Sequence, residues 1–331
     1  MRVCVYGAGA IGGHIAARLA RGGAEVSVIA RGAHLRAIQA EGLAVEAADG
    51  TLRCRPRATD DPTTLGPQDA VIVTVKAPAL PQVAAGIAPL LGPDTPVAFV
   101  MNGVPWWYLD RTPRDGRRLP LLDPGDALRD SIGIPRSLGG VVYSAASVVA
   151  PGVVRALAPD SRVVLGELDG AMTPRLAALA QAIAAGGMHG DAVPDIRRAV
   201  WTKLLGNLTT GPLCLLGRCS MRDALAAPAV RDAALAIARE AMAVAAALGE
   251  PIGGDTPEGR IARSATLHHR PSILQDLEAG RPMEVEALFL APLALAREAG
   301  VATPMLDLVV ALAVQAAREA GLYGPQAEAS A

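Results

Sequence analysis

The sequence predicts an α/β protein with a doubly wound sheet in its N-terminal part, followed by an all-helical C-terminal domain. Three observations predict it. A strand, a glycine-rich turn, a helix and a second strand follow one another within residues 2–31. Further short apolar runs, several ending in a polar residue, continue up to residue 193. From Asp195 onward, long segments rich in alanine and leucine repeat apolar residues at helical intervals. We therefore expect one domain at residues 1–194 and another at residues 195–331.

The first element is a nucleotide-binding turn. Residues 2–6, RVCVY, predict a short buried strand, and the glycines that follow it lead into a helical pattern. Gly7, Gly9 and Gly12 have the spacing G-x-G-x-x-G. Gly7 allows the tight turn, Gly9 lets the backbone approach a pyrophosphate, and Gly12 lets the helix close on the sheet. The alternative is a glycine-rich turn without a ligand, but the context favours a Rossmann-type site whose cofactor contacts come from Gly7, Gly9, Ala10, Ile11 and Gly12.

The second strand, within residues 24–31, indicates which dinucleotide is bound. NAD-binding units usually end this strand with an acidic residue that holds the ribose 2′-hydroxyl. Here the strand ends Ile29-Ala30-Arg31, so a guanidinium stands at that position. A guanidinium suits a 2′-phosphate. The sequence therefore favours NADP(H), with Arg31 as a cofactor ligand, over the alternative of a solvated arginine that contacts nothing.

Two further apolar strands end in polar residues. Residues 69–76, DAVIVTVK, end in Lys76, and residues 97–104, VAFVMNGV, contain Asn102. Ligands of doubly wound sheets gather at the carboxyl ends of the strands, so Lys76 is expected in the cofactor crevice. Asn102 could hold the nicotinamide amide or a substrate oxygen, although Asn-Gly is also ordinary turn chemistry.

The segment at residues 105–130 is rich in proline, aspartate and arginine and predicts a long loop or insertion. Its cluster of Trp106, Trp107 and Tyr108 could cover a substrate, face a partner or simply pack locally. Strand patterns at residues 139–157, 161–170 and 187–193 and a helical pattern at residues 174–186 complete the first domain.

The C-terminal half predicts helices at residues 196–210, 230–249, 272–280, 284–300 and 305–321, and a frayed tail at residues 323–331. In the first of these helices Lys203 and Asn207 are four residues apart, so they share a face. An ammonium and an amide on that face have two explanations. Either the face meets solvent, or it lines a cleft in which Lys203 handles a proton.

The composition limits the class of protein. The chain has 331 residues, of which 51% are hydrophobic and 19% charged, and its formal net charge is −1. This balance gives no basic surface for nucleic acid or membranes. Four scattered cysteines predict reduced thiols and a cytoplasmic protein. No metal site is expected, and the alanine-rich helices could form a homodimer.

The order of GAGAIGG, VTVK, MNGV, IRRAVWTKLLGN and PSILQDLEAGRPMEVEAL resembles the ketopantoate reductase (2-dehydropantoate 2-reductase) family over nearly the whole chain. The resemblance implies NADPH-dependent reduction of a 2-oxo acid in pantothenate biosynthesis. It also implies residue roles. Lys203 and Glu284 match catalytic positions, Lys203 as the proton donor. Substrate contacts are implied at Asn102, Asn207 and Ser272, and a place in the cofactor and substrate crevice at Lys76.

Two departures from the family pattern bear on the substrate. Gly211 stands where such reductases commonly have a second asparagine, and Phe289-Leu290 replace a common Asn-Gly. Both changes remove polar groups from the region expected near the pocket, and buried polar groups discriminate strongly between substrates. The alternatives to ketopantoate are therefore a related branched 2-oxo acid, another ketone or 2-oxo acid of a specialised pathway, or no turnover at all, in a non-catalytic NADP(H)-binding regulator.

Overall fold

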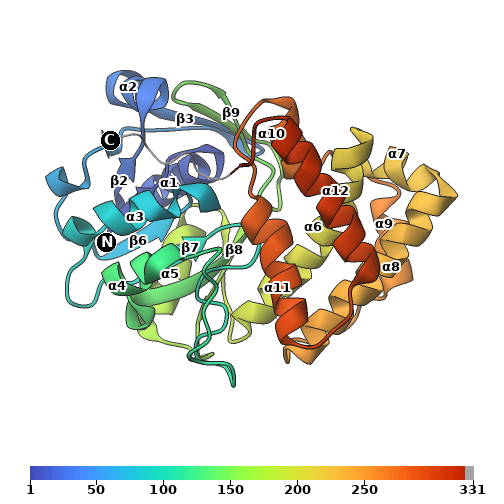
Figure 1. Cartoon of the computed structure of the whole chain (residues 1–331). Coiled ribbons are helices and arrows are strands. Elements are labelled where there is room, and N and C mark those ends of the chain that lie inside the picture. The colour runs from blue at the N-terminus through green and yellow to red at the C-terminus, as the bar shows by residue number, and fades with distance from the viewer. Residues whose placement is uncertain (325–331) are drawn as a thin grey trace. The chain divides into compact units, whose positions relative to one another are not determined.

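The computed structural model describes residues 1–324, which divide into two compact units, Met1–Ile196 and a second unit that begins at Arg197 (Figure 1). The first unit combines sheets and helices, and the described part of the second contains helices only. This confirms the predicted fold class. Of the predicted tail, residues 325–331 lie outside the described residues.

Within residues 1–324, one sheet has eight strands in the order β12-β11-β8-β7-β6-β1-β2-β5. Neighbouring strands are parallel except for β8 and β11, which are antiparallel. The strands are β1 (Arg2–Tyr6), β2 (Glu25–Ile29), β5 (Arg57–Thr59), β6 (Ala70–Val73), β7 (Val97–Val100), β8 (Ser137–Tyr143), β11 (Arg162–Glu167) and β12 (His189–Ala192). All residues of β6 and β7 are buried, as expected of central parallel strands that are covered on both faces.

The helices of the first unit are α1 (Ala10–Arg21), α2 (Gly32–Glu41), α3 (Leu80–Gly86), α4 (Ala127–Ser131) and α5 (Pro174–Ala185). Short 3₁₀ turns accompany them at η1 (Pro62–Thr64), η2 (Ala77–Ala79), η3 (Ala88–Leu90), η4 (Pro124–Asp126) and η5 (Ile134–Arg136). α1 and α5 contribute Ile15, Leu19, Leu179 and Ile183, all fully buried, to the main apolar core. The predicted helices that follow the glycine turn and begin at residue 174 are therefore confirmed.

A second sheet was not predicted. Among the described residues it contains four strands in the order β4-β3-β10-β9, namely β3 (Leu43–Ala47), β4 (Gly50–Cys54), β9 (Ser147–Ala150) and β10 (Val153–Ala156). The strand pattern predicted at residues 139–157 is thus divided between two sheets. α1 packs against the inner face of this small sheet, where Gly13 has room for no side chain because a Cβ would lie 2.9 Å from Cγ2 of Val154.

A buried polar chain ties α1 to the turn between β3 and β4. His14 is fully buried, its Nε2 accepts a hydrogen bond from Nε of Arg18 at 3.2 Å, and its Nδ1 lies 3.1 Å from the hydroxyl of Ser144. The Arg18 guanidinium then donates twice to the carboxylate of Asp49, at 2.7 and 2.8 Å. Burial, with a smaller contribution from the charge of Arg18, lowers the pKa of His14 to about 4.

This histidine predicts a loss of stability in mild acid. In the unfolded chain the pKa of His14 is about 6.5. Between pH 6.5 and about 4 the unfolded state therefore binds a proton at this histidine and the folded state does not. Stability is unaffected above pH 6.5 and falls as the pH drops to 4, by at most about 3 kcal/mol. Urea denaturation at pH 7 and 4.5 should show a smaller difference for His14→Gln than for the wild type. Equal pH dependence in both proteins would contradict the assignment.

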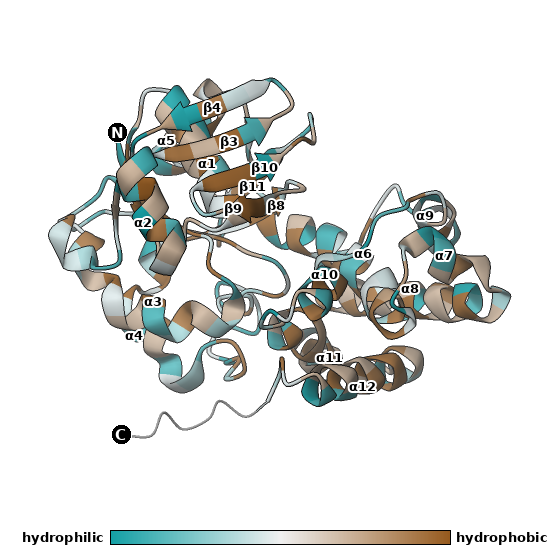
Figure 2. Cartoon of the chain, turned by 90° about the horizontal axis from the view of Figure 1, so that it is seen from above, coloured by the Kyte–Doolittle hydropathy of each residue, from teal (hydrophilic) through white to brown (hydrophobic). Residues whose placement is uncertain are grey.

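The described part of the second unit is built from helices, the first of which begins one residue earlier, in the first unit. They are α6 (Ile196–Gly217), α7 (Met221–Ala226), α8 (Pro228–Ala247), α9 (Pro257–Ser264), α10 (Ser272–Glu278), the π-helix η6 (Glu286–Leu290), α11 (Ala291–Glu298) and α12 (Pro304–Glu319). The predicted helical segments are confirmed, and α7 and α9 are additional. Figure 2 shows hydrophilic and hydrophobic residues along the same helices, as expected of helices with one buried face. No helix within residues 1–324 is long and apolar enough to span a membrane.

Candidate functional site

The glycine turn after β1 has the geometry that its sequence predicts. Gly7 has a φ of 107°, and a Cβ there would lie 2.6 Å from Cγ1 of Val75. At Gly12 a Cβ would lie 2.1 Å from the carbonyl oxygen of Gly7, so the helix could not close on the turn. Gly9 differs, because a Cβ there would meet nothing within 4 Å. Gly9 is also the N-cap of α1, and no side chain caps the helix. The turn therefore presents open backbone at a helix start, as a phosphate requires.

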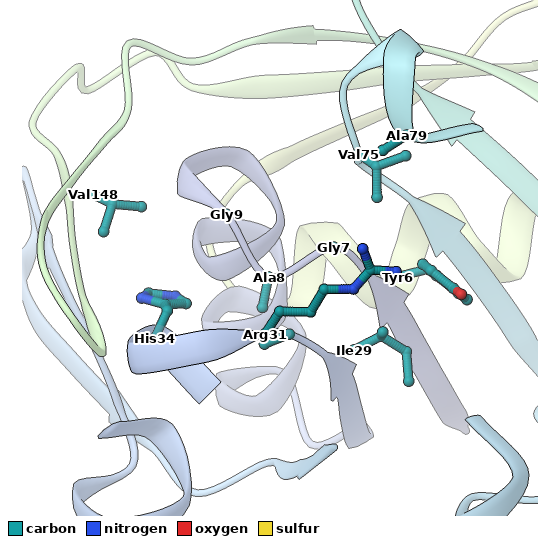
Figure 3. A pocket seen from close by; sticks show the side chains of 11 residues that line it. Tyr6, Gly7, Ala8, Gly9, Ile29, Arg31, His34, Val75, Ala79 and Val148 are labelled. Carbon is teal, nitrogen blue, oxygen red and sulfur yellow. The ribbon is translucent and has the colours of Figure 1, made fainter. Parts of the chain in front are cut away.

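A cavity of about 380 Å³ lies over this turn (Figure 3). Its walls come from the ends of β1 and β2, the start of α2, the segment after β6, and β9 of the small sheet. The lining residues are Tyr6, Gly7, Ala8, Gly9, Ile29, Ala30, Arg31, His34, Val75, Ala79 and Val148. Apolar side chains and open glycine backbone, with two basic side chains, could hold the adenosine half of a dinucleotide.

Arg31 lies at the place that the sequence predicts. It is the residue before α2, it is exposed, and it lines the cavity. In Figure 3 its side chain extends toward Tyr6. Burial raises the pKa of the Tyr6 hydroxyl, and the charge of Arg31 lowers it by less. Among residues 1–324, the lining of the cavity contains no acidic residue.

Other predicted cofactor residues lie near the turn but do not line the cavity. Lys76 follows β6 and precedes η2, and Asn102 follows β7. Because β1, β6 and β7 are parallel neighbours, both residues stand beyond the edge of the sheet at which Gly7 lies. Ala10 and Ile11 form the first turn of α1.

The second unit brings two of the predicted residues into electrostatic contact. Lys203 is in α6, half-buried, and Glu284 is 5% exposed just before η6. Burial lowers the pKa of the Lys203 ammonium to about 8, and the charge of Glu284 opposes this shift. A lysine with this pKa can both donate and accept a proton near neutral pH.

Two more predicted residues lie on neighbouring elements. Asn207 is half-buried one turn after Lys203 in α6, and Ser272 is the exposed first residue of α10. The next residue, Ile273, approaches α6 closely, because a Cβ at Gly211 would lie 3.7 Å from its Cγ2. Ser272 therefore stands beside α6.

The two departures from the family pattern lie against each other. The same Cβ at Gly211 would lie 3.9 Å from Cε1 of Phe289, which is 1% exposed in η6. An asparagine at residue 211 would therefore point its amide at apolar groups of Ile273 and Phe289. Gly211 and Phe289 are a matched small and large pair, which sequence alone did not reveal.

The tryptophan-rich segment is buried within the first unit. Trp106 is 3% exposed and meets Phe99 of β7 edge-on at 5.6 Å, and Trp107 is fully buried against Gly139 of β8. Local packing, one of three predicted alternatives, therefore holds, and a partner-facing surface is wrong.

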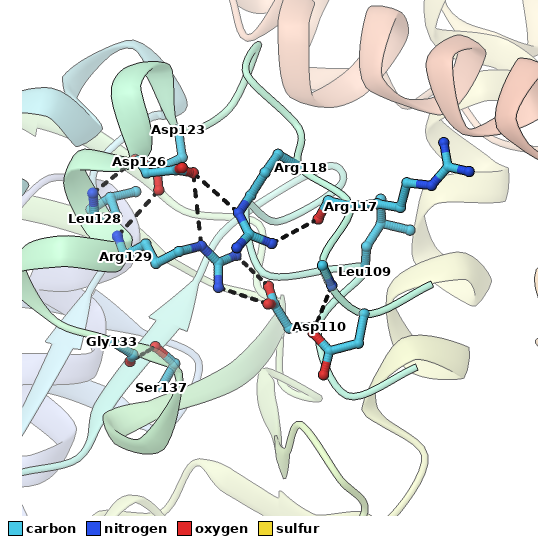
Figure 4. A network of polar contacts seen from close by, with 12 residues as sticks. Leu109, Asp110, Arg117, Arg118, Asp123, Asp126, Leu128, Arg129, Gly133 and Ser137 are labelled. Atoms are coloured by element: carbon cyan, nitrogen blue, oxygen red, sulfur yellow. Dashed lines mark hydrogen bonds and ion pairs between the residues drawn. The ribbon is translucent and has the colours of Figure 1, made fainter. Parts of the chain in front are cut away.

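An ion pair fixes the same segment. Arg129 of α4 stacks over Trp106 and forms a two-fold ion pair with Asp110, both bonds measuring 2.7 Å (Figure 4).

Comparisons with known proteins show the family of the chain. The sequence model "Ketopantoate reductase PanE/ApbA" matches residues 3–170, and "Ketopantoate reductase PanE/ApbA C terminal" matches residues 195–317. The chain is 42% identical to the 2-dehydropantoate 2-reductase of Mesorhizobium japonicum, covering 98% of this chain and 100% of that protein.

Solved structures are similar over the whole chain. A crystal structure from Ralstonia solanacearum, provisionally named a ketopantoate reductase, has a TM-score of 0.91 at 42% identity and covers 97% of this chain and 99% of its own. The 2-dehydropantoate 2-reductase of Methylococcus capsulatus has a TM-score of 0.81 at 27% identity, with coverage of 97% and 98%.

Proposed function

The chain belongs to the ketopantoate reductase family and is an oxidoreductase, and from that premise we propose that it reduces 2-dehydropantoate (ketopantoate) to pantoate with NADPH. The observation that carries this proposal is the match to the Mesorhizobium japonicum reductase, because it extends over both units. Family membership also sets aside a non-catalytic regulator as the alternative function.

The first unit fits the predicted cofactor, NADP(H). Gly9 leaves open backbone at the start of α1, and the described residues that line the cavity include none that would repel a 2′-phosphate near Arg31. NADPH supplies a hydride when bound. Arg31 would hold the 2′-phosphate and Lys76 would line the crevice, while the amides at Ala10 and Ile11 would face the pyrophosphate.

In the second unit, Lys203 is proposed as the proton donor. Hydride addition to the substrate carbonyl carbon places negative charge on its oxygen, and the Lys203 ammonium would stabilise that charge and transfer its proton to it. Glu284 would keep Lys203 protonated through its negative charge. Asn207 and Ser272 would hold the carboxylate and hydroxyl groups of the substrate.

This assignment predicts an alkaline limit to the reaction. A proton donor must be protonated, so kcat should be nearly constant below the pKa of Lys203 and fall about tenfold per pH unit above about 8. Glu284→Gln removes a charge that raises this pKa, so its limit should move to lower pH. The pH dependence of kcat, with saturating NADPH, measures both. A wild-type rate that stays level to pH 10 would exclude Lys203 as the donor.

The substrate is tested by initial rates of NADPH oxidation with ketopantoate, with other branched and linear 2-oxo acids, and with NADH in place of NADPH. A kcat/KM for ketopantoate at least tenfold above that for the other acids supports the proposal. Turnover of another acid with none of ketopantoate would contradict the substrate and keep the reaction class.

A second candidate is a 2-oxo acid with a more apolar side chain. The contact of Gly211 with Ile273 and Phe289 favours it, because apolar groups stand where the family commonly has amides. Gly211→Asn should then raise the kcat/KM ratio of ketopantoate to 2-oxoisovalerate, which lacks the hydroxymethyl group. An unchanged ratio would remove this candidate.

A further inference from the structure

Glu284 stands at the boundary of a helix whose start is held in an unusual way. Its carbonyl oxygen accepts a hydrogen bond from the backbone N–H of Leu288 at 3.1 Å, and the π-helix η6 follows within two residues. Among residues 197–324, no side chain caps this start. The first N–H groups of a helix find no partner within the helix. Another part of the chain must therefore hold this end.

The turn that follows α12 reaches this helix start. Gly321, with a φ of 68°, reverses the chain, and the N–H of Leu322 returns to the carbonyl oxygen of Ala317 at 3.0 Å. The carbonyl oxygen of Leu322 in turn accepts a hydrogen bond at 3.3 Å from the backbone N–H of Met283. Met283 is the residue before Glu284, so the turn supports the chain on one side of the carboxylate.

Tyr323 supports the chain on the other side. Burial, then the charge of Glu286 and a hydrogen bond with it, raise the pKa of the Tyr323 hydroxyl. Glu286 is the first residue of η6, two residues after Glu284. The guanidinium of Arg318 in α12 lies over the Tyr323 ring, 5.8 Å from its centre. The turn therefore contacts the residues that precede and follow Glu284.

This support bears on the proton donor. π-Helical turns are rare and often occur at functional sites. Glu284 is 5% exposed, and its charge opposes the burial that lowers the pKa of Lys203. The interaction of two charges weakens as their separation grows. A carboxylate on a loosely held helix start would therefore act less strongly on Lys203.

We propose that Tyr323 is a positioning residue, and that the turn at residues 321–324 holds the start of η6 so that the Glu284 carboxylate stays where it acts on Lys203. The charged group that acts on Lys203 is Glu284, and those that act on Tyr323 are Glu286 and Arg318. This role rests on the proposed function of Lys203 and Glu284 and is independent of which 2-oxo acid is reduced.

The test is the pH dependence of kcat in the full chain, with saturating NADPH and the 2-oxo acid that the wild type reduces best. Tyr323→Ala removes the ring and the hydroxyl, and Tyr323→Phe removes the hydroxyl alone. Each is made in the wild type and in Glu284→Gln, which has no carboxylate to be positioned. Gln315→Ala is the control, because Gln315 is exposed in α12 and bonds to Glu319 of the same helix.

Tyr323→Ala is expected to lower the alkaline limit of kcat by roughly half a pH unit, because a weaker influence of Glu284 lowers the pKa of Lys203. Its kcat should be nearly unchanged at pH 6.5 and about threefold lower above pH 8.5. Tyr323→Phe should shift the limit in the same direction, and Gln315→Ala should not shift it. Neither Tyr323 variant should move the limit further in Glu284→Gln.

Equal limits in Tyr323→Ala and the wild type, or an equal shift in the two backgrounds, would overturn the role of Tyr323. A loss of kcat that is the same at every pH would also overturn it, because a merely structural role would act in that way. A wild type without an alkaline limit would refute Lys203 as the proton donor and this role with it, so the two failures are distinct.

Discussion

Replacing Lys203 with methionine is expected to lower kcat by about 10²- to 10⁴-fold, because methionine keeps the apolar stem and removes the proton and the charge. Kd for NADPH should stay within about twofold of the wild-type value, since the cavity in the first unit is unaltered. The measurement is single-turnover NADPH oxidation at saturating substrate, which isolates the chemical step from product release.

Thr202→Ala is the matched control for this variant. Thr202 is the exposed neighbour of Lys203 in α6, and its hydroxyl donates a hydrogen bond to the carbonyl oxygen of Arg198. Its kcat should remain within about threefold of the wild type. If Lys203→Met turned over ketopantoate at the wild-type rate while folded, another group would have to donate the proton.

Removing the carboxylate of Asp110 is expected to destabilise the first unit by roughly 3 kcal/mol, because Asp110→Ala leaves the Arg129 charge largely buried without its two-fold partner. Asp110 is 3% exposed, and the Arg129 side chain is 18% exposed. The bonds to Asp110 raise the pKa of the Arg129 guanidinium. An arginine side chain is protonated even without such bonds, so Arg129 stays charged in the variant. The free energy of unfolding in urea, followed by circular dichroism, measures the loss.

A surface pair in the second unit provides the control for this prediction. Arg239 and Glu258 also approach to 2.7 Å, but their side chains are 62% and 59% exposed. Glu258→Ala should leave the free energy of unfolding nearly unchanged, because water screens an exposed pair. The double variant Asp110→Ala, Arg129→Leu should regain part of the stability, since it removes the unpaired charge. If Asp110→Ala lost as little stability as Glu258→Ala, water or Asp126 would have to compensate the charge of Arg129.

The parts that the sequence predicted depend on short-range patterns. The turn Gly7-x-Gly9-x-x-Gly12 and the end of β2 at Arg31 are read from consecutive residues, and buried runs such as β6 are apolar throughout. The second half was predictable as helices because apolar residues recur at helical intervals over long segments.

The small sheet was not predictable in the same way. Its pairing joins Val153 to Ala44 across more than a hundred residues, and every residue of β9 is exposed, so no alternation marks that strand. The place of His34 in the cavity lining was missed for the same reason, because its Nδ1 accepts a hydrogen bond from the backbone N–H of Gly152, in the turn between β9 and β10. The burial of Trp106 likewise depends on contacts outside its own segment pattern, with Phe99 of the preceding strand and with Arg129 of α4.

The three tryptophans of the chain are almost completely buried, and they are divided between the units: Trp106 and Trp107 in the first, Trp201 in the second. Their fluorescence therefore reports on both units at once, and in Trp201→Phe it reports on the first alone. Coincident melting curves for the two proteins would mean that the units unfold as one cooperative block. Separate curves would assign a melting temperature to each unit without any added label.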